Sequence, residues 1–398
     1  MIRTLLSLLA LLCCNTVAAQ TFYVCEGPDT RTAQQIVFTD DSMPTASVDS
    51  ITLSVPRGQR FVGGDISVLT KYEQQQATYL DRDGKAIGDV LTFLREQGWN
   101  TMRVRLFVDP SQDSDKNVCQ DLDYVTSLAQ RIKAAGLLLM LDFHYSDTWA
   151  DPGKQFTPKR WQGADKQMLT DSVYVYTRIS LLAMKKAGII PELIQVGNEI
   201  TNGMLWPTGK LDPSGSDGFD VLCQFLKAGC KACREVCPKS QIIIHTERAG
   251  NWDVTRNYYQ QLRRRQVDYD IIGLSYYPMW HKDIPNLGKT LDNLAWLFPE
   301  KPVMIVETAA YYSHENDPWS KEDTYAEFYP ISVEGQAQFT RELVRELQKH
   351  HNVSGLFWWF PEENASGNSV TKGWLNRGLF DNHTGKALPA LKEFKYYK

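Results

Sequence analysis

The chain has no large excess of charge of either sign and few long apolar runs. Its 398 residues carry 43 Lys and Arg against 47 Asp and Glu, which gives a formal net charge of −4 and a pI near 6.0. This balance provides no electrostatic attraction to nucleic acid or to an anionic membrane. Beyond the N-terminal segment, no run is apolar enough to cross a bilayer. We therefore expect no nucleic-acid partner and no membrane span.

Several widespread catalytic motifs are missing as well. The chain has no G-x-S-x-G nucleophile elbow, no P-loop and no glycine fingerprint of a dinucleotide-binding fold. His144 and His245 could ligate a metal, but no third ligand stands at a diagnostic spacing. We expect both histidines to form hydrogen bonds instead, and we predict no metal site.

Residues 1–19 have the pattern of a secretory signal peptide. A basic Arg3 precedes an apolar stretch over residues 5–12, and small residues follow before residue 20. The stretch is too short for a transmembrane helix. Cys13 or Cys14 could carry a lipid anchor, but the residue before Cys13 is a leucine rather than a small one. We expect a cleaved, exported protein that is secreted, periplasmic or located at the cell surface.

Cysteines are few, and most of them lie on one segment. After the signal peptide the chain has Cys25, Cys119, Cys223, Cys230, Cys233 and Cys237. The C-x-x-C within CQFLKAGCKACREVC could bind a metal. However, Cys223, Cys230 and Cys237 repeat every seven residues, which is the spacing of a buried helix face where cysteine acts as a small hydrophobe. We expect that helical stripe, and a disulfide between more distant cysteines remains open.

Short apolar runs alternate with segments of helical spacing along most of the chain, which indicates a parallel sheet. The candidate strands cover residues 61–69, 101–107, 137–145, 193–200, 241–248, 271–278, 303–311 and 353–360. Eight such strands predict an α/β fold, a (β/α)8 TIM barrel over residues 61–398. Residues 20–60 are polar with scattered β-branched residues. We predict a small β-type extension there, packed on the barrel, because about 40 residues cannot bury a core unaided.

Two glutamates stand at the ends of separate apolar runs. Glu199 ends LIQVGNE, and Glu307 ends PVMIVE. A carboxylate at the C-terminal end of a barrel strand is typical of a catalytic residue, and two facing carboxylates cleave glycosidic bonds. Either glutamate alone could instead cap a following helix, where its charge would suit the helix dipole. Their placement within the regular strand pattern favours catalysis.

Other polar and aromatic residues converge at the same end of the predicted barrel. Arg103 and Arg105 share one face of their strand, so both should point into the barrel, and one should keep Glu307 ionised. Trp and Tyr present flat apolar faces to sugar rings, although a single Trp could equally belong to the core. The expected substrate-binding residues are Asp65, Arg105, His144, Asp147, Trp149, Asn198, Trp206, His245, Tyr277, Trp280 and Trp359.

Six stretches carry a family resemblance: RVRLFVDPS, LDFHYSDTWADPGKQ, QVGNEITNGMLWPTG, IGLSYYPMWH, VMIVETA and WLNRGLFDNHTGKALPAL. They resemble the arabinogalactan endo-β-1,4-galactanases of glycoside hydrolase family 53, in order from around residue 61 to the C-terminus. The resemblance implies a (β/α)8 barrel with the acid/base on its fourth strand and the nucleophile on its seventh. Glu199 is then the general acid/base and Glu307 the nucleophile, with Asn198 placed to bind the sugar 2-hydroxyl.

The resemblance also implies a reaction, the retaining hydrolysis of β-1,4-galactan, a pectin side chain found in type I arabinogalactan. We expect a polysaccharide substrate, a monomer and no cofactor. Two alternatives stay open. The first is a glucanase, xylanase or mannanase of the same clan, because a barrel does not select a sugar by itself. The second is a non-catalytic glycan-binding protein, although such a protein has no need of both glutamates.

The chain departs from the family pattern in two places. Some bacterial relatives have an Asp, His and Asn-rich calcium loop after the nucleophile, and here that stretch reads SHENDPWSKEDTY. The acidic alternation is missing, so calcium is an option that we do not expect. The family's Trp-Glu-Pro after the last strand becomes Trp359-Phe360-Pro361-Glu362.

Overall fold

The computed structural model of the protein describes residues 20–25, 33–38, 60–115, 117–315, 325, 327–364, 366 and 374–397. The chain divides into two compact units, Met1–Arg57 and Gly58–Lys398. In the first unit, β1 (Gln20–Cys25) pairs antiparallel with β2 (Ala33–Phe38). These strands agree with the β-type character expected of residues 20–60, and the packing of that segment on the barrel stays a prediction. The predicted signal peptide, with Cys13 and Cys14, lies outside the described residues.

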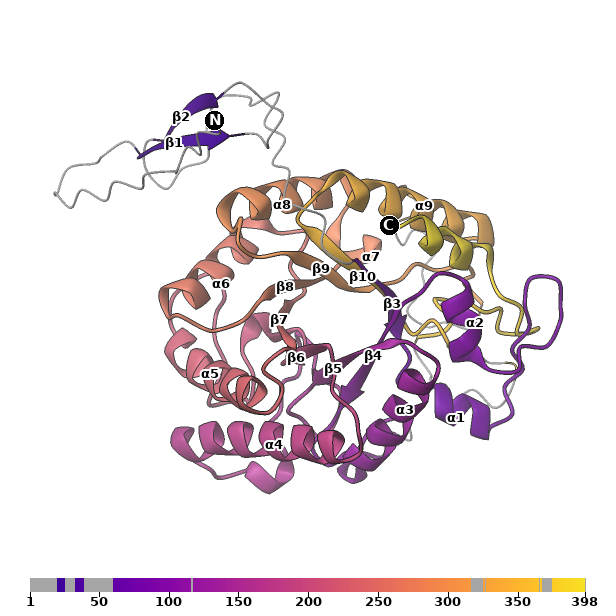
Figure 1. The fold of residues 1–398 in the computed structure, drawn as a ribbon, viewed down its shortest axis with the longest axis horizontal. Coiled ribbons are helices and arrows are strands. Elements are labelled where there is room, and N and C mark those ends of the chain that lie inside the picture. The colour runs from indigo at the N-terminus through magenta and orange to yellow at the C-terminus, as the bar shows by residue number, and fades with distance from the viewer. Residues whose placement is uncertain are drawn as a thin grey trace, which may run out of the picture. The chain divides into compact units, whose positions relative to one another are not determined.

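The second unit contains a closed barrel of eight parallel strands that follow one another in chain order (Figure 1). They are β3 (Phe61–Asp65), β4 (Thr101–Leu106), β5 (Leu138–Phe143), β6 (Leu193–Val196), β7 (Gln241–Thr246), β8 (Ile271–Ser275), β9 (Val303–Thr308) and β10 (Val353–Trp359). β10 closes the barrel by pairing with β3, with Gly355 opposite Phe61. The predicted (β/α)8 fold is confirmed. Each strand ends before its predicted range does, because the polar residues at the strand ends belong to loops.

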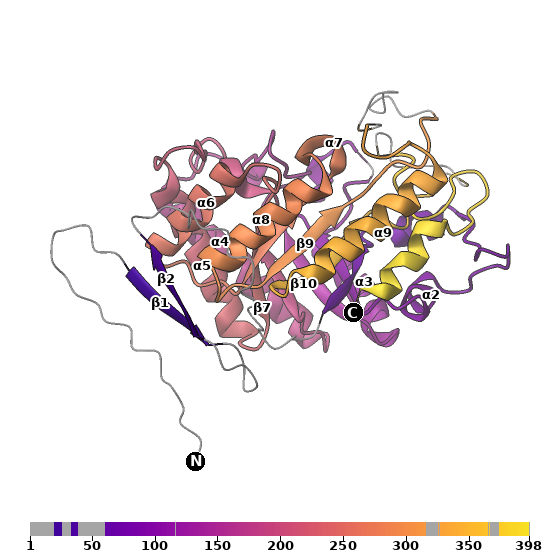
Figure 2. The ribbon, with the colours of Figure 1, turned by 90° about the horizontal axis from the view of Figure 1, so that it is seen from above.

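Helices form the outer layer of the barrel. The α-helices are α1 (Leu69–Gln74), α2 (Val90–Glu96), α3 (Leu122–Ala134), α4 (Lys166–Lys186), α5 (Phe219–Val236), α6 (Trp252–Arg264), α7 (Pro278–His281), α8 (Ile284–Leu297) and α9 (Val333–Lys349). Short 3-10 helices are η1 (Pro110–Gln112), η2 (Lys159–Trp161), η3 (Ile200–Asn202) and η4 (Pro389–Tyr396). The side chains of Asp121 and Asp165 accept backbone N–H groups at the starts of α3 and α4. In Figure 2, α8 and α9 lie side by side along β9 and β10.

Along the barrel strands, side chains alternate between the helix layer and the barrel interior. One apolar cluster fills the interior, and we call it the lower layer: Phe61, Met140, Leu193, Ile243, Ile271, Met304, Val306 and Phe357. Buried polar side chains nearer the C-terminal ends of β3 to β9 form the upper layer: Asp65, Arg103, Arg105, Asp142, Gln195, His245, Ser275 and Glu307. The interior therefore changes from apolar to charged toward the C-terminal ends of the strands.

The cysteine stripe lies on α5 as predicted. Cys223, Cys230 and Cys233 are buried free thiols on this helix, and Cys237 follows directly after it. Burial raises the pKa of the Cys233 thiol well above its usual range, so the thiol stays protonated. In the part of the chain that the structure describes, no helix is long and apolar enough to cross a membrane.

Candidate active site

Glu199 and Glu307 line one cavity of about 560 Å³ at the C-terminal ends of the barrel strands. The lining comprises His144, Trp149, Ala150, Asp151, Pro152, Lys154, Asn198, Glu199, Glu247, Arg248, Tyr277, Trp280, His281, Glu307, Trp359 and Trp374. Another cavity, of about 580 Å³, lies between α3 and α4 and contains none of the predicted site residues. The chemistry of the lining, rather than the size of the cavity, identifies the candidate site.

Glu307 reaches the cavity through a break in the alternation of β9. Ile305 faces the helix layer and Val306 the barrel interior, so regular alternation would turn Glu307 outward. The pairing of β8 with β9 shifts at this point, from Leu274 opposite Ile305 to Ser275 opposite Glu307. This irregularity is a β-bulge, and a bulge re-aims the side chain that follows it. Here it turns Glu307 into the barrel.

Glu199 lies beyond the end of β6 in a left-handed backbone conformation, with φ 48° and ψ 48°. This conformation is unfavourable for a residue with a Cβ and persists where neighbouring groups hold it. Gln155 Nε2 donates to the carbonyl oxygens of Asn198 and Glu199, at 2.8 and 3.3 Å. The Glu199 N–H donates to His245 Nδ1 at 3.3 Å, and Ser275 Oγ lies 2.6 Å from Glu199 Oε1. Gln155 and His245 thus hold the backbone of this residue, and Ser275 holds its carboxyl group.

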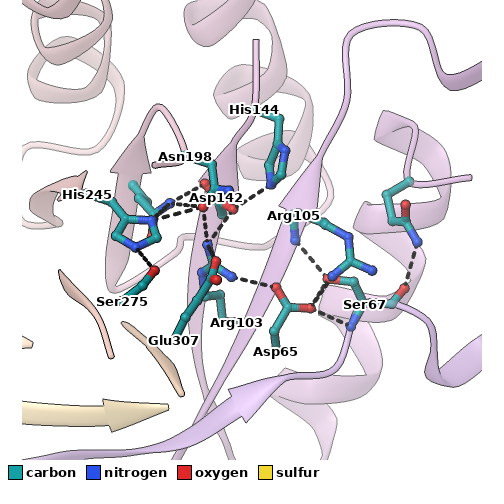
Figure 3. A network of polar contacts seen from close by, with 12 residues as sticks. Asp65, Ser67, Arg103, Arg105, Asp142, His144, Asn198, His245, Ser275 and Glu307 are labelled. Carbon is teal, nitrogen blue, oxygen red and sulfur yellow. Dashed lines mark hydrogen bonds and ion pairs between the residues drawn. The ribbon is translucent and has the colours of Figure 1, made fainter. Parts of the chain in front are cut away.

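The two arginines of β4 connect the carboxylates of the upper layer (Figure 3). Arg103 Nη2 lies 2.9 Å from Glu307 Oε1 and 2.7 Å from Asp142 Oδ2, while its Nη1 lies 2.9 Å from Asp65 Oδ2. Arg105 Nη1 contacts the other oxygen of Asp65 at 2.7 Å. The prediction that both arginines point into the barrel is confirmed. Of the two arginines, Arg103 contacts Glu307, whereas Arg105 pairs with Asp65.

Burial raises the pKa of both candidate catalytic carboxyl groups. At Glu199, burial and then the charge of Glu307 raise the pKa well above its usual range. At Glu307, burial raises the pKa to about 7 even though Arg103 opposes the rise. Arg103 acts in the expected direction, since it favours the ionised form of Glu307, but burial outweighs it and the charges of Asp142 and Asp65 add to the rise of the pKa. Since Arg103 favours the ionised form of Glu307, a proton shared by the two glutamates rests on Glu199.

The predicted substrate-binding residues fall into three groups. The cavity lining contains His144, Trp149, Asn198, Tyr277, Trp280 and Trp359. Asp65, Arg105 and His245 lie fully buried behind that lining. His245 contacts Asn198, the Arg105 guanidinium lies over the rings of Trp149 and Trp359, and Asp65 forms an ion pair with Arg105.

Asp147 and Trp206 lie outside the lining, so the structure does not bring them to the cavity. Asp147 Oδ2 accepts the backbone N–H of Lys159 at 2.7 Å. The Trp206 indole N–H donates to the carbonyl of Asn202 at 3.0 Å, and Lys210 Nζ sits 4.5 Å from the centre of its ring. Local hydrogen bonds account for both positions.

Sequence reasoning missed several members of the lining. Trp374 packs edge-on against Trp359 with ring centroids 4.0 Å apart. It lies in a loop well after the end of β10, so a search for site residues at strand ends does not find it. Glu247 and Arg248 follow β7 and form an ion pair of 2.9 Å. Glu247 does follow an apolar run, so its position at the end of a predicted strand was a signal in the sequence that could have found it.

Among the described residues, no group of three or more His, Cys, Asp or Glu side chains could hold a metal ion. Most of the stretch considered for calcium, residues 316–324, lies outside the described residues. The prediction about calcium therefore stays a prediction.

Comparisons with known proteins agree with this geometry. The sequence profile of glycosyl hydrolase family 53 matches residues 61–394. A probable arabinogalactan endo-β-1,4-galactanase A of Aspergillus terreus is 33% identical over 308 residues, covering 75% of this chain and 84% of that protein. An endo-β-1,4-galactanase of Bacillus subtilis is 32% identical, covering 75% of this chain and 69% of that protein. The GH53 catalytic domain of Ignisphaera aggregans superposes with a TM-score of 0.78 at 30% identity, covering 87% of this chain and 98% of that domain. The chain therefore belongs to glycosyl hydrolase family 53.

Proposed function

We propose that the protein is a retaining endo-β-1,4-galactanase that hydrolyses β-1,4-galactan, including the type I arabinogalactan side chains of pectin. One observation carries the proposal: Glu199 and Glu307 line the same cavity in different electrostatic surroundings. Membership of family 53 and the galactanase names of its relatives support the substrate. A purely glycan-binding protein would not need a paired nucleophile and acid.

Glu307 is the nucleophile. Arg103 Nη2 contacts its Oε1, and the Tyr277 hydroxyl donates to its Oε2, each at 2.9 Å. These charge-assisted contacts aim the carboxylate and favour its ionised form. Attack on the anomeric carbon forms a covalent glycosyl-enzyme and neutralises the charge of Glu307.

Glu199 is the general acid and then the general base. Its raised pKa keeps the proton available until the leaving glycosidic oxygen takes it. The charge of Glu307 is one cause of that raised pKa, so the pKa of Glu199 falls once the glycosyl-enzyme has formed. The ionised Glu199 then accepts a proton from the water that releases the sugar.

Aromatic rings make up much of the remaining lining and bind the galactose rings. Trp280 stands 61% exposed at the cavity, and its ring centroid lies 5.2 Å from that of Tyr277 and 6.3 Å from that of Trp374. Flat apolar faces next to polar groups suit sugar rings, whose C–H faces stack while their hydroxyls form hydrogen bonds. We assign the 2-hydroxyl to Asn198: its contacts with the Ala150 carbonyl and with Arg103 orient the amide, and its Nδ2 carries a second hydrogen that can donate to a sugar hydroxyl.

A panel of polysaccharides tests the proposal. Galactan, cellulose, xylan and mannan are incubated with the protein side by side. We expect galactan alone to be depolymerised, with viscosity falling faster than reducing ends appear, because cuts are internal. Preference for a gluco-configured polymer, or release of single galactose units from chain ends only, would contradict it.

We further propose that the protein is exported, acts as a monomer and needs no metal ion. The N-terminal pattern of Arg3 and the apolar residues 5–12 supports export. The carboxylate pair supports metal independence, because it supplies both the nucleophile and the acid. Sequencing the N-terminus of the mature protein, sedimentation and dialysis against a chelator test the three statements. Activity that is lost on dialysis and restored by calcium would overturn the last.

A further inference from the structure

Behind Glu199, a chain of buried polar side chains crosses two neighbouring strands. Ser275 Oγ, at the end of β8, lies 2.6 Å from Glu199 Oε1 and 2.8 Å from Nε2 of His245 on β7. His245 Nδ1 lies 2.9 Å from the amide oxygen Oδ1 of Asn198 (Figure 3) and 3.2 Å from Nε2 of Gln195. Ser275 and His245 are 0% exposed and are not part of the cavity lining. Any effect they have on the reaction acts through the lining residues that they contact, Glu199 and Asn198.

The number of hydrogens in this chain limits which groups can donate. Ser275 has one hydroxyl hydrogen, so it donates to one of its two partners and accepts from the other. Burial, and next the charge of Arg103, lower the pKa of His245 well below its usual range. The neutral ring carries a single N–H. If that hydrogen is on Nε2, His245 donates to Ser275 and Ser275 donates to Glu199, which we call the forward direction. If it is on Nδ1, Ser275 donates to His245 Nε2 and Glu199 must donate to Ser275, which we call the reversed direction.

Only one direction serves a group that alternates between acid and base. In the reversed direction Glu199 needs a hydrogen on Oε1 throughout, because the hydroxyl hydrogen of Ser275 points to His245. In the forward direction Oε1 accepts a hydrogen bond whether or not Oε2 carries a proton. The forward direction also leaves His245 Nδ1 free to accept from Gln195 Nε2 and from the Glu199 backbone N–H, at 3.2 and 3.3 Å. It forgoes a hydrogen bond from Nδ1 to Asn198 Oδ1, which instead accepts from Arg103 and from Gln195.

We propose that His245 and Ser275 form a fixed donor chain, from His245 Nε2–H to Ser275 Oγ–H to Glu199 Oε1, which confines the transferable proton of Glu199 to Oε2. The inference rests on the proposed role of Glu199 and adds two positioning residues to it. No proton travels along the chain. Its work is to orient the carboxyl group and to stabilise the ionised form by a charge-assisted hydrogen bond.

Charged groups on several elements surround the chain. Glu307 on β9, Glu247 after β7 and Asp151 after β5 all raise the pKa of Glu199, and the hydrogen bond from Ser275 lowers it.

His245 is faced by Arg103 from β4 and by Asp142 and His144 from β5. A variant that removes only the donor chain leaves all of these charges in place, so its effect on the pKa of Glu199 can be assigned to the chain.

A matched pair of variants at His245 makes the first test. The side-chain amide of His245→Gln reaches the place of Nε2 and can donate to Ser275, whereas His245→Asn is too short. Ser275→Ala removes the hydrogen bond to Glu199, and His245→Asn removes the group that directs the Ser275 hydrogen toward Glu199. Either change destabilises ionised Glu199 and raises its pKa. The basic limb of kcat/KM against pH should move up by about one pH unit in His245→Asn and Ser275→Ala, and by less than about 0.3 unit in His245→Gln.

Leaving-group dependence separates this effect from general damage to the fold. At neutral pH, Ser275→Ala should hydrolyse a phenyl β-galactobioside about tenfold more slowly, and a dinitrophenyl one at the wild-type rate, since dinitrophenolate departs without a proton. Ser180, 1% exposed on α4, provides the control. Ser180→Ala also deletes a buried hydroxyl, and it should change neither the hydrolysis rates of the two substrates nor the basic limb of kcat/KM against pH.

The tautomer of His245 can be read directly by nitrogen-15 NMR on histidine-labelled protein. The chain has seven histidines, and the signal missing from His245→Gln identifies the one of interest. We expect the Nε2–H tautomer. An Nδ1–H tautomer, or basic limbs that move equally in the two His245 variants, would overturn the donor chain. Galactan cleavage by the wild type is measured first, so that failure of the proposed function is told apart from failure of this inference.

Discussion

The lower and upper layers of the barrel interior share most of their strands but differ in chemistry. β7 supplies Ile243 to the lower layer and His245 to the upper one, two residues later, and β5 does the same with Met140 and Asp142. All four side chains are fully buried. In the lower layer, burying an aliphatic side chain contributes about 1.5–3 kcal/mol per residue. In the upper layer, burial removes charges from water, and ion pairs only partly offset that loss.

The difference shows how this barrel separates stability from chemistry. An ion-pair network as buried as that of Arg103 is weak evidence for stability. The same network holds Glu307 in one orientation, which a reacting carboxylate needs. We infer that the lower layer contributes most of the stability of the interior and that the upper layer contributes the reactivity. The predictions below test that division, beginning with the largest effect.

Glu307→Ala should abolish the reaction and spare the fold. We expect activity on galactan to fall about 10⁵-fold, because no nucleophile remains. The melting temperature should change little, since Arg103 keeps its contacts with Asp65 and Asp142. Added azide should restore part of the activity and yield an α-galactosyl azide. More than about 1% residual activity without azide would contradict the assignment of Glu307.

Arg103→Met should lower both the stability of the fold and the activity. It leaves Asp65, Asp142 and Glu307 buried without their shared cation, and breaking a buried pair in this way costs about 3–5 kcal/mol. Activity should fall about 10³-fold. Because Arg103 lowers the pKa of Glu307, its loss raises that pKa, and the acidic limb of the pH profile should move above its wild-type position near pH 7. An unchanged acidic limb, followed in a pH series of kcat/KM, would show that Arg103 does not act on Glu307.

Ile243→Ala should do the opposite of Glu307→Ala. The substitution leaves a void in the lower layer, and we expect the free energy of unfolding in urea to fall by about 2–5 kcal/mol. The kcat of the folded protein should stay within about threefold of wild type, because His245 and the cavity are unchanged. A large loss of kcat without a loss of stability would mean that the two layers are not separable.

Two tryptophans give the smallest contrast. Trp280→Ala removes an exposed ring from the cavity lining, and KM for galactan should rise about tenfold. Trp206→Ala removes a ring that lies outside the lining, so KM should change by less than about twofold. Equal effects of the two substitutions would show that substrate reaches beyond the cavity described here.

Much of the fold could be predicted from the sequence, because buried parallel strands are nearly continuous apolar runs. The same runs locate Glu199 and Glu307 at strand ends. The direction of each side chain could not be predicted, since it depends on a β-bulge before Glu307 and on a left-handed residue at position 199. Both features arise from contacts with neighbouring strands and leave no local pattern.

Loops were also beyond the reach of sequence patterns. Trp374 enters the cavity from a segment without periodicity, whereas Trp206 follows β6 closely but turns to Asn202 instead. The pairing of Arg105 with Asp65 rather than Glu307 depends on lateral distances between strands, which spacing along one strand does not determine.

The anomeric form of the first product tests the central claim most directly, namely that Glu199 and Glu307 act as a retaining pair. Galactan oligosaccharides are hydrolysed in an NMR tube, and proton spectra are recorded before the new reducing ends mutarotate. Two successive displacements at the anomeric carbon, the first by Glu307 and the second by water activated by Glu199, predict that the β-anomer appears first. Initial formation of the α-anomer would show a single displacement by water and would contradict the account.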